Sequence, residues 1–317
     1  MSFPPVTDCW FLTGSTASGK TEVGIALAVR LGAEIVSLDS MALFRGMDIG
    51  TAKPTAEQRK MVPHHLIDIV EPHEDFSLAS YLEAAHRAIA EIHARGRPVL
   101  FVGGTPLYLK GLLRGVFQGP KADWAFRDAL LHEAKGQGPE FLHRRLMEHD
   151  PATAARLHPN DTRRILRALE VFHATGEPIS KLQQQFAQGR AADECRVFVL
   201  SWPRAESHRR IERRVKEMFA AGLVDEVRRL LAAAGPLGRT ARQAVGYREV
   251  IEHVEGRLGR AETIELVERH TRQLAKRQET WFRSLSECRF VPVAEEPDAA
   301  ELAEKIVTSE EEENNAK

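Results

Sequence analysis

A glycine-rich segment near the start of the chain carries the residues best suited to bind phosphate. Residues 14–21 read GSTASGKT and match GxxxxGK[ST], the P-loop pattern, at every fixed position. Gly14 and Gly19 can adopt backbone angles that other residues resist, so successive N–H groups can point at anionic oxygens. Lys20 would reach the terminal phosphates, and the Thr21 hydroxyl would face a magnesium ion. The predicted phosphate-binding residues are Gly14, Ser15, Thr16, Ala17, Ser18, Gly19, Lys20 and Thr21.

This motif alone favours ATP or GTP and leaves the reaction open, because a P-loop specifies only a diphosphate or triphosphate. Two further residues follow predicted strands and would lie at the same edge of a sheet. Asp39 comes after EIVSL (34–38), where a carboxylate could bind magnesium through water or act as a general base. Thr105 follows Gly103 and Gly104, and the paired glycines would let a ligand approach the backbone closely.

Arginine is concentrated in three later segments. These are DTRRILRALE (161–170), HRRIERRVKEM (208–218) and RHTRQLAKRQETWFR (269–283). Together they predict a basic groove that grips a nucleic-acid backbone, although a charged helix face can also be merely solvated. Arg210 and Arg214 lie four residues apart on one helix face and could instead clamp a diphosphate.

The elements that must position these groups alternate between strands and helices. Strands are predicted at 9–13, 34–38, 65–70, 98–102 and 196–201, and helices at 20–30 and 81–94. The pattern predicts an α/β fold, with a parallel P-loop sheet and C-terminal helices. Residues 117–195 read as an all-helical insertion between the two parts of the core, 1–116 and 196–300. Residues 301–317 read as an acidic tail, whose last part, SEEEENNAK, we expect to be disordered.

Composition indicates the class of protein and the compartment in which we expect it. The 317 residues include 43% hydrophobic and 28% charged residues, as in ordinary globular proteins, and the net charge is −1. Three separated cysteines suggest neither a disulfide framework nor a zinc site. Neither a signal peptide nor an apolar run of about 18 residues is evident, so we expect a cytoplasmic protein without a membrane partner. We also expect a monomer.

Several longer strings resemble one family, the tRNA dimethylallyltransferases, also called isopentenyl-tRNA transferases. The resemblance covers about residues 10–290 and rests on TASGKT (16–21), DSMALFRGMDIGTAKP (39–54), PHHLIDIVEP (63–72), VGGTPLYLKGLL (102–113), HPNDTRRILRALEVF (158–172), AVGYREV (244–250) and TRQLAKRQETWFR (271–283). Two departures are visible. Ser15 stands where the family usually has Pro, and Phe44 lacks the hydroxyl of the common Tyr, so any hydrogen bond attributed to that hydroxyl has no donor here.

The resemblance implies a reaction in which the dimethylallyl group of dimethylallyl diphosphate moves to N6 of the adenine on the 3′ side of the anticodon. Magnesium would assist and diphosphate would leave, so the P-loop would hold a leaving group. Asp39 would accept an N6 proton, Lys20 and Arg214 would stabilise the diphosphate, and Thr105 would position the amine or a diphosphate oxygen. The adenine would be flipped out of its stack.

The resemblance also assigns contacts to the anticodon stem-loop. The expected tRNA-binding residues are Asp39, Ser40, Met41, Ala42, Thr105, Arg127, Arg163, Arg164, Ile165, Leu166, Arg167, Arg242, Gly246, Tyr247, Arg248, Lys276, Arg277 and Arg283. Three alternatives remain open. An adenylate isopentenyltransferase would use free AMP as the acceptor, a small-molecule P-loop kinase would consume ATP, and a non-catalytic protein would only bind RNA.

Overall fold

The computed structural model describes residues 3–117, 119–138, 140–183, 189–233, 235–293 and 298–315. The chain divides into two compact units. One comprises residues 6–113 and 189–317, and we call it the α/β unit. The other comprises residues 1–5 and 114–188, and we call it the helical unit.

Six parallel strands form the sheet of the α/β unit. In chain order they are β1 (Trp10–Gly14), β2 (Glu34–Ser37), β3 (His64–His65), β4 (Val99–Gly103), β5 (Val197–Ser201) and β6 (Cys288–Pro292), and their spatial order is β3-β2-β4-β1-β5-β6. The predicted parallel α/β fold is confirmed. The strand expected at 65–70 is wrong beyond residue 65, because Leu66 and Asp68 take positive φ angles of 58° and 57°.

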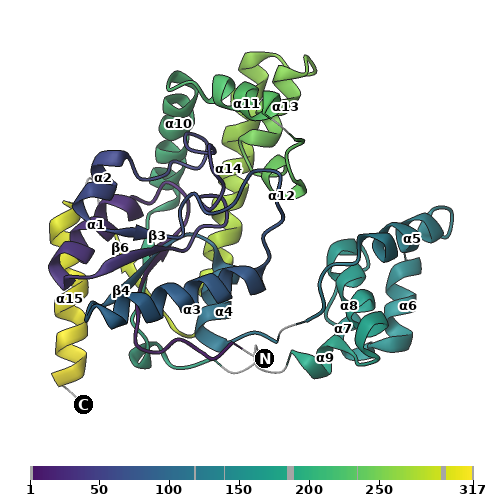
Figure 1. Cartoon of the computed structure of the whole chain (residues 1–317), viewed down its shortest axis with the longest axis horizontal. Helices are drawn as coiled ribbons and strands as arrows, with labels where there is room; N and C mark the ends of the chain where they lie inside the picture. The colour runs from purple at the N-terminus through teal and green to yellow at the C-terminus, as the bar shows by residue number, and fades with distance from the viewer. Residues whose placement is uncertain are drawn as a thin grey trace. The chain divides into compact units, whose positions relative to one another are not determined.

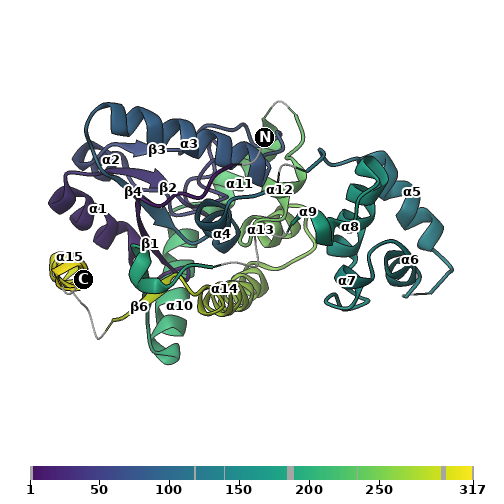
Figure 2. The same cartoon turned by 90° about the horizontal axis from the view of Figure 1, so that it is seen from below.

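Helices pack on this sheet and close its core. They are α1 (Lys20–Leu31), α2 (Ala56–Met61), α3 (Leu78–Ala94), α4 (Pro106–Arg114), α14 (Arg260–Arg283) and α15 (Ala299–Asn315), with a short 3-10 turn at Ala192–Glu194. Leu27 of α1 and Ile306 of α15 share one buried cluster with Leu12, Leu100 and Phe198 of the strands. Figures 1 and 2 show the core helices around the sheet. The P-loop therefore starts from a rigid, fully packed strand, since β1 is central.

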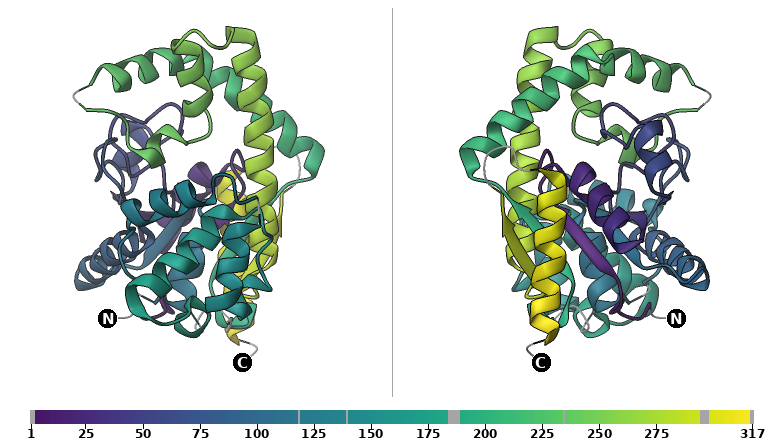
Figure 3. Two further views of the ribbon diagram at one scale, coloured as in Figure 1. Left: turned by 90° about the vertical axis from the view of Figure 1, so that its right-hand side faces the viewer. Right: turned by 90° about the vertical axis from the view of Figure 1, so that its left-hand side faces the viewer.

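The end of the chain differs from the sequence-based expectation. Residues 299–315 form α15, which lies along α1, as the right-hand view of Figure 3 shows. Leu302, Ile306 and Val307 are buried, and Glu310 pairs with Arg289 and Arg196. The expectation of a disordered end is therefore wrong for residues 309–315, because one face of the helix is apolar and its buried carboxylate has two cationic partners.

A second group of helices belongs to the α/β unit and follows β5. They are α10 (Arg204–Ala220), α11 (Leu223–Ala232), α12 (Arg239–Arg242) and α13 (Tyr247–Val254). Helix α10 packs along α14, and α11 packs on α13 (Figure 1). Gly222 ends α10 and begins α11 with a φ of 97°, a left-handed angle that glycine adopts without strain. These helices carry Arg210, Arg214 and Glu226 towards the sheet edge.

The helical unit consists of α5 (Trp124–Ala134), α6 (Phe141–His149), α7 (Pro151–Ala154), α8 (Thr162–Thr175) and α9 (Ile179–Leu182). Ile165 and Leu169 of α8 pack with Leu130 of α5 and Leu146 of α6 in a separate hydrophobic core. Figure 2 shows these helices of the unit. The inserted all-helical part of the predicted fold class is thus present. Its Leu and Ile residues recur at helical spacing, so each helix has one apolar face, and these faces together form the core.

Candidate functional site

Three strand ends bring the predicted site residues together. Strands β2, β4 and β1 are neighbours in the sheet, and all three point the same way. The segments that follow them carry Asp39, Thr105 and the P-loop. Ligands of open α/β sheets bind beyond the carboxyl ends of the strands, at the point where the strand order reverses. Here β2 lies on one side of β1 and β5 lies on the other. The topology therefore gathers these residues although up to 91 positions separate them in sequence.

The P-loop has the backbone that the motif predicts. Gly14 has a φ of 151° and Gly19 a φ of 84°. A Cβ atom on Gly14 would lie 2.9 Å from the carbonyl oxygen of Leu200, so no larger residue fits. The Lys20 amine donates to the Ser15 carbonyl at 2.8 Å, which keeps it folded over the loop.

Trp202 and Arg210, which follow β5 in the chain, donate hydrogen bonds to the backbone of the P-loop. The Trp202 indole donates to the Ser18 carbonyl at 2.9 Å, and Arg210 Nε donates to the Ala17 carbonyl at 2.9 Å. The Arg210 guanidinium also stacks over the Trp202 ring at 4.2 Å. Arg210 is therefore engaged with the loop backbone, which distinguishes it from Arg214.

Gln278 is a site residue that the sequence analysis missed. Its Oε1 accepts the Thr16 amide at 2.9 Å, and its Nε2 donates to the Gly104 carbonyl at 2.6 Å. A Cβ on Gly104 would lie 2.8 Å from the Gln278 amide nitrogen. The buried side chain thus joins the P-loop to the end of β4. Its position within a basic stretch of α14 masked it, although its spacing from Ala275 and Phe282 marks a buried helix face.

Asp39 and Thr105 lie side by side and are held by the backbone. Asp39 Oδ1 accepts the amides of Met41 at 2.8 Å and Ala42 at 3.3 Å. Thr105 Oγ1 accepts the Ser40 amide at 3.0 Å. These bonds fix both side chains at the sheet edge, and Asp39 Oδ2 forms no hydrogen bond with the residues that the structure describes.

The site encloses positive charge. Lys20, Thr21, Asp39, Arg214 and Gln278 line one cavity of about 100 Å³. Burial, and then the charge of Arg214, lowers the pKa of Lys20 to about 8, while Asp39 opposes this shift. Burial also lowers the pKa of Arg214, against the opposing charges of Asp39 and Glu22.

Among the described residues, the Arg214 side chain makes a single weak hydrogen bond. Its Nη2 lies 3.4 Å from the Thr51 carbonyl. No carboxylate in the described part of the chain comes within ion-pair distance of its guanidinium. Two enclosed cations without a salt bridge form an anion site, because burying them is costly until a negative ligand is present.

The same cavity offers oxygen atoms that suit magnesium. Thr21 and Asp39 both line it, and hydroxyl and carboxylate oxygens are the ligands this ion prefers. Magnesium binds proteins through one or two such groups together with substrate phosphates and water. The residues present therefore fit a phosphate-bound magnesium ion held by Thr21.

The predicted RNA-binding residues of the helical unit fall into two groups. Arg163 and Arg164 are exposed on the first turn of α8, whereas the side chains of Ile165 and Leu166 lie in the helical core. Arg127 and Arg167 both pair with the buried carboxylate of Glu170. Ile165 and Leu166 thus have a packing role in the helical core, and Arg127 and Arg167 have an ion-pairing role within the protein.

The predicted RNA-binding residues of the α/β unit divide in the same way. Those with exposed side chains are Arg242, Arg248, Lys276, Arg277 and Arg283. Ser40 and Met41 are half-buried, and Ala42 is buried. Gly246 begins α13, and Tyr247 is fully buried with its hydroxyl 2.6 Å from Glu226. Tyr247 therefore has a packing role in the protein itself.

In the described ranges, no helix combines the length and apolar character that crossing a bilayer requires. The profile of the family described as IPP transferase matches residues 42–285. A tRNA dimethylallyltransferase from Rhodopirellula baltica is 49% identical over 315 residues, covering 96% of this chain and 94% of that protein. Another from Geobacter metallireducens is 50% identical over 281 residues, covering 88% and 90%.

A solved structure agrees with these relatives. The full-length tRNA isopentenylpyrophosphate transferase from Bacillus halodurans matches with a TM-score of 0.67 and 36% identity, covering 98% of this chain and 99% of that one. The matched region contains Gly104, Arg214 and Gln278 of the cavity described above. With its P-loop sheet, its helical insertion and these relatives, the chain belongs to the tRNA dimethylallyltransferase family of prenyltransferase enzymes.

Proposed function

We propose that this enzyme transfers the dimethylallyl group of dimethylallyl diphosphate to N6 of the adenine on the 3′ side of the anticodon. The observation that carries the proposal is the cavity in which Lys20 and Arg214 face Asp39. It combines an anion site with a carboxylate, and a diphosphate leaving group and an amine nucleophile require these two features together.

In the proposed reaction, N6 attacks the allylic carbon, the bond from that carbon to the diphosphate oxygen breaks, and diphosphate leaves. Lys20, Arg214 and the P-loop amides stabilise the charge that grows on the leaving oxygens. Asp39 Oδ2 accepts the N6 proton while Oδ1 stays bonded to the loop backbone. Thr105, fixed beside Asp39 through Ser40, orients the amine or a diphosphate oxygen.

Magnesium, held by Thr21, would supply further charge neutralisation at the diphosphate. The target base must leave its stack to present N6 at the sheet edge. Exposed arginines and lysines would hold the anticodon stem-loop through its phosphates, with Arg163 and Arg164 on the helical unit and Lys276 and Arg277 on α14. We also propose that the enzyme is cytoplasmic and acts as a monomer.

The test is mass analysis of nucleosides after incubation with dimethylallyl diphosphate, magnesium and an anticodon stem-loop RNA. We expect one dimethylallyl group on the adenine that follows the anticodon, and no consumption of ATP in a parallel reaction. Modification of free AMP in place of RNA would assign the adenylate-prenylating activity instead. ATP consumption with phosphorylated product would assign a kinase, and RNA binding without transfer would contradict catalysis.

A further inference from the structure

A loop between Asp39 and α2 separates the cavity from a larger cleft. The cleft has a volume of about 1210 Å³, and residues 48, 49 and 52–54 line it. Residues 51–54 also line the 100 Å³ cavity. Lys20, Thr21 and Arg214 border both spaces. We call residues 48–54 the wall loop, since it stands between the two spaces beside the predicted phosphate site.

The wall loop is a tight turn. The Ala52 amide donates to the Ile49 carbonyl at 3.0 Å, and the Lys53 amide donates to the Asp48 carbonyl at 3.1 Å. Ala52 has a φ of 47°, a left-handed angle that is uncommon outside glycine. These bonds tie residues 52 and 53 back to residues 49 and 48, so a group that fixes the first residues also restrains the Thr51 carbonyl between them.

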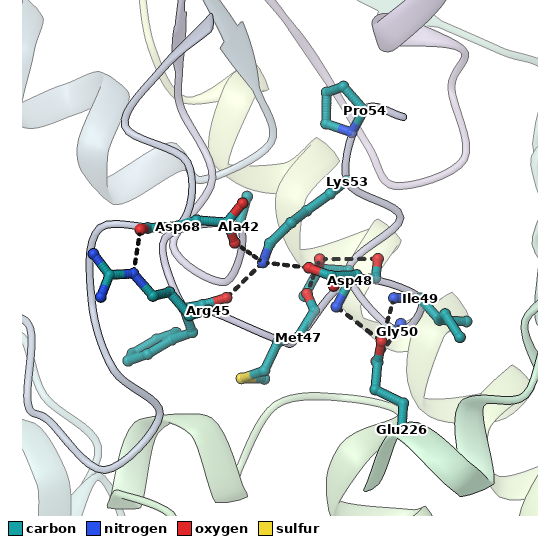
Figure 4. A network of polar contacts seen from close by, with 12 residues as sticks. Ala42, Arg45, Met47, Asp48, Ile49, Gly50, Lys53, Pro54, Asp68 and Glu226 are labelled. Carbon is teal, nitrogen blue, oxygen red and sulfur yellow. Dashed lines mark hydrogen bonds and ion pairs between the residues drawn. The ribbon is translucent and has the colours of Figure 1, made fainter. Parts of the chain in front are cut away.

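One carboxylate from a distant helix fixes those first residues. Glu226 of α11 is buried, and its Oε2 accepts the amides of Asp48 at 3.0 Å and Ile49 at 2.8 Å. Its Oε1 accepts the Gly50 amide at 3.2 Å and the Tyr247 hydroxyl at 2.6 Å. Figure 4 shows this carboxylate facing the turn.

Tyr247 supports the same contact through its ring. A Cβ atom on Gly50 would lie 2.4 Å from the ring, so the loop backbone rests directly on it. Burial, and then the charge of Glu226, raises the pKa of Tyr247, which keeps its hydroxyl a donor. Helices α11 and α13 thus present a carboxylate acceptor and a flat ring to the loop, and the Tyr247 hydroxyl donates to that carboxylate.

Lys53 holds the other end of the wall loop. Its side chain is 2% exposed, and its amine donates to Asp48 at 2.8 Å and to Asp68 at 2.6 Å (Figure 4). It also donates to the Phe44 carbonyl at 2.5 Å. Because both ends of the loop are held, the Thr51 carbonyl is fixed at the position where it accepts from Arg214, 3.4 Å from its Nη2.

We propose that Glu226 is a positioning residue for the donor diphosphate: by binding three successive amides of the wall loop, it sets the width of the phosphate site and the place of Arg214. Glu226 reaches neither substrate, and it acts through the loop. This inference rests on the proposed function, because it assumes that the anion next to Arg214 is the diphosphate.

The test compares Glu226→Gln with the wild type. An amide would place donor hydrogens against backbone donors at one of the two oxygens, so the loop loses part of its anchor. We expect the KM for dimethylallyl diphosphate and the Kd for inorganic diphosphate to rise about tenfold, equivalent to about 1.4 kcal/mol. The Kd for stem-loop RNA should stay within about twofold. Hydrogen exchange at Asp48, Ile49 and Gly50 should become faster.

Glu310→Gln is the matched control. Glu310 is also a buried glutamate, but its partners are Arg196 and Arg289, and it lies on α15, outside the lining of both spaces. It should lower the melting temperature without changing the Kd for diphosphate. Tyr247→Phe keeps the ring under Gly50 and removes one bond to Glu226, so we expect about a two- to threefold rise in that Kd.

Two outcomes would overturn the inference. One is an unchanged Kd for diphosphate in folded Glu226→Gln, and the other is an equal rise in Glu310→Gln. If Glu226→Gln does not fold, Tyr247→Phe decides by the same comparison. Direct binding of inorganic diphosphate needs no transfer, so failure of the wild type to prenylate RNA would contradict the proposed function and leave this test intact.

Discussion

Two groups of buried charge, one in each unit, differ in whether their members have ionic partners. In the helical unit, Glu170 is 1% exposed and binds both Arg127 and Arg167, so every charge in the group has a partner. In the α/β unit, Lys20 and Arg214 are enclosed beside the P-loop without a salt bridge in the described residues. The arginines look alike in sequence, and only their partners distinguish them.

The difference indicates what each group does. A paired buried ion holds helices in register, and its removal leaves an uncompensated charge. An enclosed cation without an acidic partner destabilises the empty protein and stabilises the complex with an anion. Arg127 and Arg167 are therefore expected to stabilise the protein itself, whereas we propose that Arg214 binds the diphosphate.

The largest expected effect comes from Arg214→Ala. Loss of a cation that stabilises the leaving diphosphate should lower the single-turnover rate of transfer by about 10² to 10³-fold. The measurement is rapid-quench transfer with enzyme in excess. Arg214→Lys should recover part of the rate, since it restores charge without the planar fork. A rate within about threefold of the wild type would place Arg214 with the structural arginines.

Asp39→Asn tests the carboxylate without disturbing the loop. The amide oxygen can still accept the Met41 and Ala42 amides, but it cannot take a proton. The single-turnover rate should fall by about 10²-fold, as for loss of a general base. The Kd for diphosphate should not rise. A near-normal rate with bound substrates would end the assignment of Asp39 as the base.

Arg127→Ala addresses the other side of the comparison. Glu170 keeps Arg167 but loses a bidentate partner, so the free energy of unfolding should fall by about 3 kcal/mol. The measurement is denaturant unfolding followed by circular dichroism. Diphosphate binding by the α/β unit should match the wild type. A stable variant with weakened diphosphate binding would show that the two units do not divide their charges in this way.

The pH dependence of diphosphate binding follows from Lys20. Its pKa is lowered to about 8, so the amine loses its charge as pH rises through that value. The Kd for inorganic diphosphate should therefore rise by up to about tenfold per pH unit above pH 8. Lys20→Arg stays charged and provides the control for ionisation of the ligand. Parallel profiles for both proteins would show that Lys20 does not cause the change.

Arg164→Ala should have the smallest effect. Arg164 is exposed, and its Nε lies 3.5 Å from Oδ2 of the half-buried Asp161. Its loss should weaken stem-loop RNA binding by a few-fold and reduce the slope of log Kd against log salt by about 1. The single-turnover rate at saturating RNA should be unaffected. An unchanged salt slope would remove Arg164 from the RNA surface.

The sequence by itself determined the parallel α/β fold, the helical insertion and the glycine-dependent backbone of the P-loop. These features depend on local patterns: alternating strands and helices, the glycines at 14 and 19, and the apolar face of residues 162–175. The placement of Asp39 and Thr105 at one edge follows from the rule that parallel strands end together.

Only the tertiary structure decided which charged residues line the cavity and which are paired within the protein. Sequence analysis grouped Arg127, Arg167 and Arg214 as functional, and it missed Gln278 and Glu226. A residue's partner often lies far along the chain, such as Glu226, 176 positions from Gly50. Local pattern cannot encode such a pairing, because it arises only when distant helices pack. The end of the chain shows the same limit, since α15 becomes ordered only by burying its apolar face with α1.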